Sequence, residues 1–297
     1  MDDQFQTTFR QMIGGSEERF FHDHWRKKTL FNPSSVPSLR GSYDFDRFRD
    51  DYRSLNFHHA TLLISVDGRG NRKMVRAVEQ NSIDDALSKG MCVVLQALLL
   101  PSTLCGIPQQ WRRFVTLHGE LCEYLLPDFP FLMKPGGPVA AVDIFCSRSE
   151  STSGGHYDSG DVFYFVLDGE KEWTVELSPD YDMGIRLAVE NAKYDLSPRR
   201  EHLKIRVRPG DCLYVPPYTY HRVSSLGRSL AVSVGLPAFT EYTLLRSSLP
   251  NIQKELCLHQ PLPTCPRTQG KLFGAAEEER KAMRRRTLET IEHILEA

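Results

Sequence analysis

A histidine and a carboxylate stand one residue apart in the stretch GGHYD, residues 154–158, directly before a run of aromatic and β-branched residues. In an extended strand, side chains two positions apart point to the same side, so His156 and Asp158 project together. A neutral imidazole and a carboxylate on one face can supply two neighbouring ligands to a divalent metal ion. The two glycines give the loop the backbone freedom to bring this pair to the start of the strand.

A third metal ligand is expected from a strand further along the chain. His221 follows a Pro-Pro pair and opens an apolar run that predicts a strand, shortly after a tight turn at residues 209–211. Two histidines and one carboxylate make the facial triad of non-haem Fe(II) sites, which leaves positions open for a chelating co-substrate and dioxygen. An isolated H-x-D pair is common by chance, so this interpretation depends on His221 joining His156 and Asp158.

The predicted strand at residues 171–177 begins with a lysine on its apolar side. Alternation places Lys171, Trp173 and Val175 on one face, and no acidic residue shares that face. Because a buried ammonium is costly unless it is paired, an inward Lys171 calls for an anion, and a substrate carboxylate is a natural candidate. The alternation leaves a second place equally open for Lys171, at the rim of the fold with its ammonium in water.

The elements that must position these residues are short β-rich runs after Pro138. Asp168-Gly169 lies between two of the runs and predicts a two-residue hairpin. Many short strands at this spacing indicate an antiparallel barrel or sandwich. The predicted strands cover residues 139–145, 162–167, 171–177, 202–207, 212–215, 221–225 and 229–236.

The N-terminal half has a different character. The stretch FFHDHWRKKTLF, residues 20–31, predicts a short helix or turn that anchors on a core, and residues 60–66 predict a buried strand. Residues 109–126 predict an amphipathic helix, because apolar residues recur there at helical spacing. A further helix is predicted at residues 275–296, where acidic residues precede basic ones. We therefore expect three regions: an N-terminal α/β segment at 1–138, a β core at 139–237 and a C-terminal helical region at 238–297.

The composition points away from several classes of protein. The chain has 297 residues and a formal net charge of -1, so a globally basic surface for nucleic acid is not indicated. No run of about 18 apolar residues predicts a transmembrane helix. The N-terminal residues lack a basic region followed by an apolar one, and the seven cysteines are dispersed without a C-x-x-C pair. These features favour a cytoplasmic protein with reduced thiols and no membrane partner.

Three separated motifs make the chain resemble the JmjC-type Fe(II)/2-oxoglutarate-dependent oxygenases of the cupin superfamily, closest to the ribosomal-oxygenase branch. The motifs are FFHDHWRKKTLF, GGHYDSGDVFYFVLDGEKEW and RPGDCLYVPPYTYHRVSSLGRSLAVSVGLP, and they span residues 20–236 in the family's order. The resemblance implies a mainly β fold, a double-stranded β-helix (jelly-roll) barrel with flanking N-terminal and C-terminal helices. Residues 139–237 would then be the catalytic core, which residues 1–138 complete and support.

The functional residues of the family fall largely on residues already singled out. Its metal ligands correspond to His156, Asp158 and His221, and its basic residue for the distal carboxylate of 2-oxoglutarate corresponds to Lys171. A hydroxyl residue on the preceding strand, which also contacts the co-substrate, corresponds to Ser147. The resemblance thus implies a dioxygenase that uses Fe(II), 2-oxoglutarate and O2. Such an enzyme hydroxylates an amino-acid side chain in a protein or peptide and releases succinate and CO2.

The chain departs from the family pattern at two places, which keep alternatives open. An Asn that the family often carries on the earlier strand is Asp143 here, and only residues 238–297 follow the barrel. That length is short for the helical dimerisation region plus the winged-helix domain of the ribosomal enzymes. Because those enzymes dimerise through helices in this region, the resemblance still implies a homodimer through the C-terminal helices.

The alternative substrates are a free amino acid or a small natural product, and demethylation is an alternative outcome. A non-catalytic JmjC-like binding module and a metal cupin that does not use 2-oxoglutarate are alternatives of other kinds. The complete triad and Lys171 both speak against the binding module, and Lys171 speaks against the metal cupin.

Overall fold

The computed structural model describes most of the N-terminal and central parts of the chain. By its internal contacts the chain divides into two compact units, Met1–Ala238 and Phe239–Ala297, and the fold below is that of the first unit. The predicted C-terminal helical region and the homodimer contact expected there lie outside the described residues, apart from two single positions. The described residues are 3–54, 61–77, 82–96, 108–126, 141–181 and 195–237, with Arg285 and Glu289.

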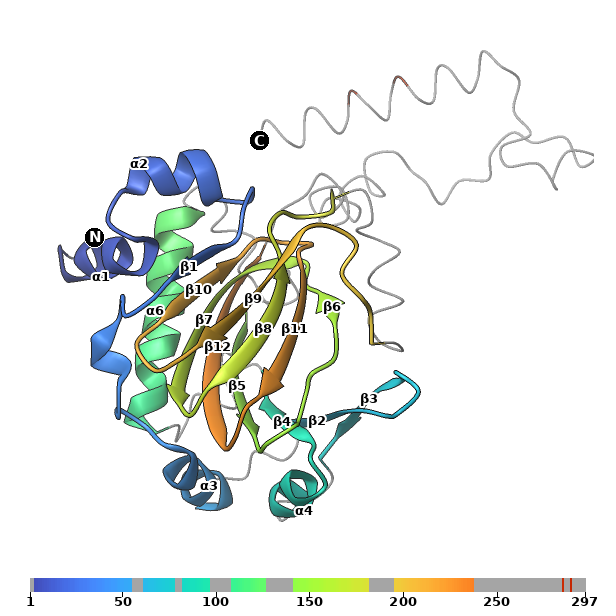
Figure 1. Cartoon of the computed structure of the whole chain (residues 1–297). Helices are drawn as coiled ribbons and strands as arrows, with labels where there is room; N and C mark the ends of the chain where they lie inside the picture. Colours follow the sequence, from blue (N-terminus) through green and yellow to red (C-terminus); the bar gives the residue numbers. More distant parts are fainter. Residues whose placement is uncertain are drawn as a thin grey trace, which may run out of the picture. The chain divides into compact units, whose positions relative to one another are not determined.

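The described strands form two antiparallel sheets, which Figure 1 shows stacked on one another. The large sheet has eight strands in the order β1-β10-β7-β12-β5-β4-β2-β3, and the small sheet has four in the order β6-β11-β8-β9. The mainly β, antiparallel architecture expected from the sequence is confirmed. The strands of the large sheet are β1 (Leu30–Asn32), β10 (Cys212–Val215), β7 (Gly160–Asp168), β12 (Ser229–Pro237), β5 (Ala141–Ser147), β4 (Cys92–Leu95), β2 (Thr61–Val66) and β3 (Arg72–Arg76). Those of the small sheet are β6 (His156–Tyr157), β11 (Tyr220–Ser225), β8 (Lys171–Glu176) and β9 (His202–Val207).

The hairpin predicted at Asp168-Gly169 is wrong in its pairing. The turn itself is present, with Gly169 at a φ of 71°, and it joins β7 directly to β8. However, β7 pairs with β10 and β12 in the large sheet, whereas β8 pairs with β11 and β9 in the small sheet. A turn signal depends on local φ preferences, but the partner of each strand depends on how two sheets bury their facing sides.

Apolar side chains from both sheets meet in one core. Tyr164 and Val166 of β7 face Trp173 and Val175 of β8, and all four are at most 2% exposed. The same cluster takes residues from three further strands: Val207, Leu213, Val215 and Ala231. Every second residue of these strands points into this layer, as expected for sheets with one buried face. The pocket described below lies within the same layer.

A helix covers the opposite face of the large sheet. It is α6, Gln109–Leu125, which matches the amphipathic helix predicted at 109–126 and contacts β12 and β5. Its Phe114 lies against Phe165 of β7, with ring centroids 6.2 Å apart. Neighbouring residues of β7 therefore point to opposite sides, Phe165 toward α6 and Tyr164 toward the core. The other described helices are α1 (Asp3–Ile13), α2 (Glu17–Arg19), α3 (Phe45–Ser54), α4 (Ser82–Ser88), a π-helical turn (Phe20–His24) and a 3-10 turn (Pro37–Leu39).

Residues 20–31 anchor the N-terminal segment, as the sequence predicts. Phe20 is 1% exposed and its ring lies 5.2 Å from that of Tyr214 on β10. The guanidinium of Arg26 donates a hydrogen bond to the buried carboxylate of Asp161, at 3.0 Å. The end of the segment also forms β1, an edge strand of the large sheet that the sequence pattern does not predict.

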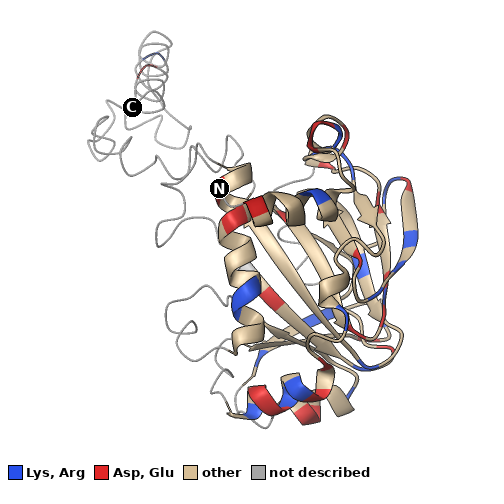
Figure 2. Ribbon diagram, turned by 90° about the vertical axis from the view of Figure 1, so that its left-hand side faces the viewer, with Lys and Arg blue, Asp and Glu red and all other residues tan. Residues whose placement is uncertain are grey.

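Charges of both signs are intermixed on the surface of the first unit. Figure 2 shows basic and acidic residues next to each other along α3. Arg49 and Arg53 of this helix both pair with Asp84 of α4, at 3.1 and 2.5 Å. No helix within the described ranges has the length and apolar character that crossing a lipid bilayer requires.

Candidate metal centre

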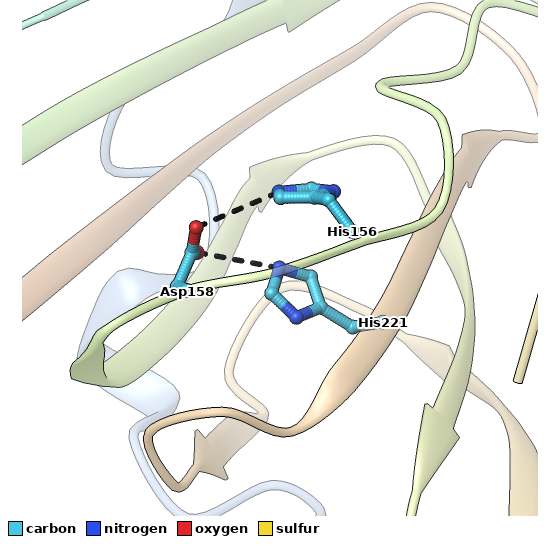
Figure 3. A group of neighbouring side chains, drawn as sticks. All are labelled: His156, Asp158 and His221. Atoms are coloured by element: carbon cyan, nitrogen blue, oxygen red, sulfur yellow. Dashed lines mark ion pairs between the residues drawn. The ribbon is translucent and has the colours of Figure 1, made fainter. Parts of the chain in front are cut away.

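The structure brings the three predicted metal ligands together on the small sheet. His156 on β6 and His221 on β11 are direct cross-strand partners, and Asp158 follows β6 immediately. The Asp158 carboxylate lies 3.8 Å from Nε2 of His156 and 3.4 Å from Nε2 of His221. One ligand atom from each residue falls within 4.8 Å of the other two. Figure 3 shows the carboxylate facing both imidazole rings, which is the arrangement a single ion requires.

Backbone carbonyls set the tautomers of both histidines. Nδ1 of His156 lies 2.9 Å from the carbonyl oxygen of Gly154, and Nδ1 of His221 lies 3.0 Å from that of Thr219. A carbonyl only accepts hydrogen bonds, so Nδ1 carries the hydrogen in each ring. The lone pair is therefore on Nε2, the nitrogen that faces Asp158. This is the usual second hydrogen bond of a metal-ligating histidine.

The protonation states also suit metal binding. Burial and the neighbouring His221 lower the pKa of His156 to about 3, so its imidazole is neutral near pH 7. The Asp158 side chain is partly buried, which alone would raise its pKa, but the nearby imidazoles outweigh this effect and hold that pKa well below its usual value. The site thus offers a neutral imidazole and an ionised carboxylate, the forms in which these residues bind metals.

Both glycines before His156 are needed where they stand. Gly154 has a φ of 74°, a conformation that residues with a Cβ rarely adopt. Gly155 has a different reason, because a Cβ there would collide with the carbonyl oxygen of Leu196 and the ring of Tyr220. The freedom expected of these glycines is thus a positive φ at one and a close approach at the other.

Lys171 lies inside the fold and not at its rim, which decides between the two places left open by the sequence. It is 2% exposed, and its Nζ donates to the hydroxyls of Ser147 and of Ser225, the latter at 2.9 Å. Ser225 is its cross-strand partner on β11, whereas Ser147 belongs to β5 of the other sheet. Burial lowers the pKa of the ammonium. Among the described residues, no carboxylate forms an ion pair with Lys171.

One pocket connects the metal triad with Lys171. It contains about 510 Å³ of space not filled by protein atoms, part of which is open to solvent. Trp173 lies between the two ends: its ring stacks on His221 at 5.3 Å and meets Tyr164 edge-on at 4.6 Å. The hydroxyl of Tyr164 and the indole N–H of Trp173 are buried and have no hydrogen-bond partner in the described part of the chain. Both residues line the pocket, as Lys171 does.

Several residues of the pocket are missing from the sequence prediction. Ser225, Tyr164 and Cys92 all line it, and so does Asp143, at the position where the family often carries an Asn. Tyr164 and Ser225 lie within the quoted motifs, but the motifs do not single them out, and finding Ser225 would have required knowing that it stands opposite Lys171.

Two further histidines do not belong to the triad: His118 is buried on α6 near Cys122, and His202 is exposed on β9.

Comparison with known proteins supports the resemblance seen in the motifs. The family model of the JmjC domain matches residues 134–244. The X-ray structure of E. coli ycfD superimposes with a TM-score of 0.61 at 17% identity, covering 93% of this chain and 67% of that protein. YcfD, a ribosomal oxygenase from Escherichia coli, in complex with cobalt and 2-oxoglutarate, gives a TM-score of 0.59 at 18% identity, covering 92% and 66%. Its complex with cobalt and succinic acid gives 0.58 at 18% identity, with the same coverage.

The identity to these structures is low, so they establish the fold, and the chain spans about two thirds of their length. Comparison with curated protein sequences gives no match. The family model nevertheless includes all three triad residues and Lys171 within its matched range. Residues 134–244 of this chain thus match the JmjC domain model, and the chain shares its fold with the YcfD structures.

Proposed function

We propose that this protein is an Fe(II)- and 2-oxoglutarate-dependent oxygenase that hydroxylates an amino-acid side chain in a protein or peptide. One observation carries the proposal: a single pocket holds a His-Asp-His triad at one end and, at the other, a buried lysine with no carboxylate partner among the described residues. A metal ion fits the first end and an organic anion fits the second. The YcfD structures with cobalt, 2-oxoglutarate and succinic acid support this assignment by analogy.

His156, Asp158 and His221 would hold the metal ion through two nitrogens and one oxygen, a donor set typical of Fe(II) that Mn(II) and Co(II) also accept. Cys92 lines the same pocket, but burial raises the pKa of its thiol, and its Sγ lies 3.9 Å from the Ser147 hydroxyl. It therefore offers no thiolate near pH 7. When bound, Fe(II) and 2-oxoglutarate supply the activation of dioxygen, with succinate and CO2 as by-products.

Lys171 would bind the distal carboxylate of 2-oxoglutarate, and Ser147 and Ser225 would help to hold it. These two hydroxyls already orient the ammonium, and they are hydrogen-bonded to each other at 2.9 Å. The hydroxyl of Tyr164, which has no hydrogen-bond partner among the described residues, would add a further donor to the carboxylate. Because the lysine end is buried between the sheets, it excludes water from this charge pair, which strengthens the attraction.

The substrate would approach from the metal end, where the Asp158 side chain is 47% exposed while that of His221 is only 5% exposed. In this interpretation the two sheets are the halves of a double-stranded β-helix barrel. Residues 139–237 are its catalytic core, 1–138 support it and 238–297 form a helical region through which two copies associate. A cytoplasmic location accompanies this proposal.

The test follows succinate formation by the full chain loaded anaerobically with Fe(II) and then exposed to air. We expect succinate from 2-oxoglutarate, together with a mass gain of one oxygen atom on a peptide from a cell extract. A gain only on a free amino acid would replace the protein substrate by a small molecule, and released formaldehyde would indicate demethylation. No succinate under any condition, including uncoupled turnover, would refute the oxygenase assignment.

A further inference from the structure

We propose that Asp195 is a positioning residue that holds the two metal-bearing strands, β6 and β11, in the geometry the metal ion requires. The inference rests on the proposed metal site but concerns a residue outside the pocket lining. Asp195 lies on the segment that leads into β9, far from the triad in sequence. Its side chain is 10% exposed, and both of its carboxylate oxygens are used.

The first oxygen holds the strand that carries His156. Oδ1 of Asp195 accepts a hydrogen bond from the backbone N–H of Gly155, with an N–O distance of 2.5 Å. The next residue, Leu196, donates its backbone N–H to the carbonyl oxygen of Gly155, at 3.0 Å. Both backbone polar groups of the residue directly before His156 are therefore bound by residues 195 and 196.

The second oxygen holds the strand that carries His221. Oδ2 of Asp195 pairs with the guanidinium of Arg222 at 2.5 Å. On the other side of His221, the hydroxyl of Tyr220 donates to the carbonyl oxygen of Leu196 at 3.0 Å. The two residues that flank His221 in the chain are therefore bound by the same two residues that bind Gly155.

Asp195 and Leu196, the two residues that bind both metal-bearing strands, are themselves attached to the large sheet. The backbone N–H of Asp195 donates to the carbonyl oxygen of Gly70, at 2.8 Å, in the turn between β2 and β3. The side chain of Asp195 thus binds the residue before β6 and a residue of β11, while its backbone N–H binds the β2–β3 turn. The hydrogen bonds that the Asp195 carboxylate accepts from Gly155 and Arg222 are charge-assisted, and such bonds are stronger than those between neutral groups.

The metal site needs these additional hydrogen bonds because the pairing between β6 and β11 is short. β6 consists of only His156 and Tyr157, and it pairs with β11 at two positions. Asp158 lies beyond the paired residues, so the ladder alone does not hold the loop from Gly154 to Asp158. Outer partners that fix metal ligands typically contribute about 10- to 100-fold to metal affinity.

The test measures Co(II) binding to the metal-free full chain by calorimetry and by the visible spectrum of the bound ion. Asp195→Ala removes both contacts, and we expect its Kd for Co(II) to rise by about 10- to 100-fold. Asp195→Asn keeps an oxygen for the Gly155 N–H but loses the ion pair, so its Kd should lie between those of the wild type and Asp195→Ala. Asp180→Asn is the matched control, because Asp180 is 9% exposed and its carboxylate likewise pairs with an arginine, Arg200, at 2.9 Å.

A purely structural role would lower the thermal stability of the metal-free Asp195 and Asp180 variants alike and leave the Kd for Co(II) unchanged. Wild-type affinity and spectrum in Asp195→Ala would therefore overturn the proposal. If the wild-type chain itself binds no Co(II), the proposed metal site is wrong, and Asp195 has no role in metal binding. Weakened Co(II) binding in Asp195→Ala with partial recovery in Asp195→Asn would support it.

Discussion

The two ends of the pocket are built in opposite ways. At the metal end, the ligands come from a two-residue strand, a loop and the strand β11, and the Asp158 side chain is nearly half exposed. At the lysine end, Lys171 and both serines that bind it come from longer strands of two sheets, and all three are at most 4% exposed. The closed end suits a co-substrate that every reaction shares, and the open end suits a substrate that must enter and leave. The comparison predicts that changes at the two ends separate metal binding from co-substrate binding.

The largest effect is expected from His221→Ala. Outer-shell changes alone typically reduce metal affinity by about 10- to 100-fold, so removal of a ligand should exceed about 100-fold and abolish turnover. Calorimetric titration of the metal-free protein with Co(II) measures the affinity, and succinate release measures turnover. His202→Ala, on the exposed face of β9, is the control and should behave as the wild type. Full metal occupancy and activity in His221→Ala would remove His221 from the site.

The next effect is expected at the other end of the pocket. Lys171→Met keeps most of the side chain and removes the charge, which costs a charge-assisted hydrogen bond of about 1.5–3 kcal/mol. The apparent affinity for 2-oxoglutarate should fall by about 10- to 150-fold, since each 1.4 kcal/mol is tenfold. Lys171→Arg should retain more affinity, because it offers a cation with a different reach. The measurement is a 2-oxoglutarate titration of succinate formation at saturating Fe(II).

Co(II) affinity in Lys171→Met should be unchanged, since Lys171 is not a ligand. Lys204→Met, an exposed lysine on β9, controls for the loss of a positive charge. An unchanged 2-oxoglutarate requirement in Lys171→Met would contradict the role assigned to this lysine. A parallel loss of Co(II) affinity would contradict the separation of the two ends.

A smaller effect is expected from Tyr164→Phe. The variant removes the hydroxyl of one residue that lines the pocket and leaves the ring contact with Trp173 in place. A neutral hydrogen bond contributes about 0.5–1.5 kcal/mol, so 2-oxoglutarate affinity should fall by about 2- to 12-fold. Tyr214→Phe removes a buried hydroxyl outside the pocket, which donates to Asp161 at 2.7 Å, and it should leave this affinity unchanged. Equal affinities in all three proteins would show that the Tyr164 hydroxyl does not meet the co-substrate.

Acid should lower the free energy of unfolding through His118, a histidine outside the pocket. Of the changes considered, this one should have the smallest effect on metal binding and on co-substrate binding. Burial lowers the pKa of His118 to about 4, below its unfolded value near 6.5. As the pH falls from 6.5 toward 4, the unfolded state takes up this proton first, so the free energy of unfolding falls, by about 3 kcal/mol at most. His118→Gln should flatten this part of the pH dependence in denaturant titrations and leave Co(II) affinity at pH 7 unchanged. An unaltered pH dependence would mean that other groups cause the acid sensitivity.

Much of the fold could be predicted from the sequence because its signals are local. The strands β9 and β10 have the predicted bounds, and the other five predicted strands after Pro138 differ by at most two residues at an end. The helix α6 has its predicted start at Gln109, because helical spacing of apolar residues is visible along the chain itself. His156 and Asp158 were predicted from the i, i+2 spacing of extended backbone, although only His156 of the two lies on β6 and Asp158 follows it.

Only the tertiary structure decided how these elements combine. The turn at Asp168-Gly169 was predicted, but its strands belong to different sheets, because pairing depends on the burial of both sheet faces. The sequence alone also allowed Lys171 to lie at the rim. Its place inside the fold follows from the strand register, which sets Ser225 opposite it, and from the packing of the two sheets, which brings Ser147 within hydrogen-bonding distance. Asp195 gave no signal, because its role depends on three segments that meet only when the chain is folded. Alternation along one strand is a property of the chain, whereas contacts between strands are a property of register and sheet packing, which sequence periodicity does not contain.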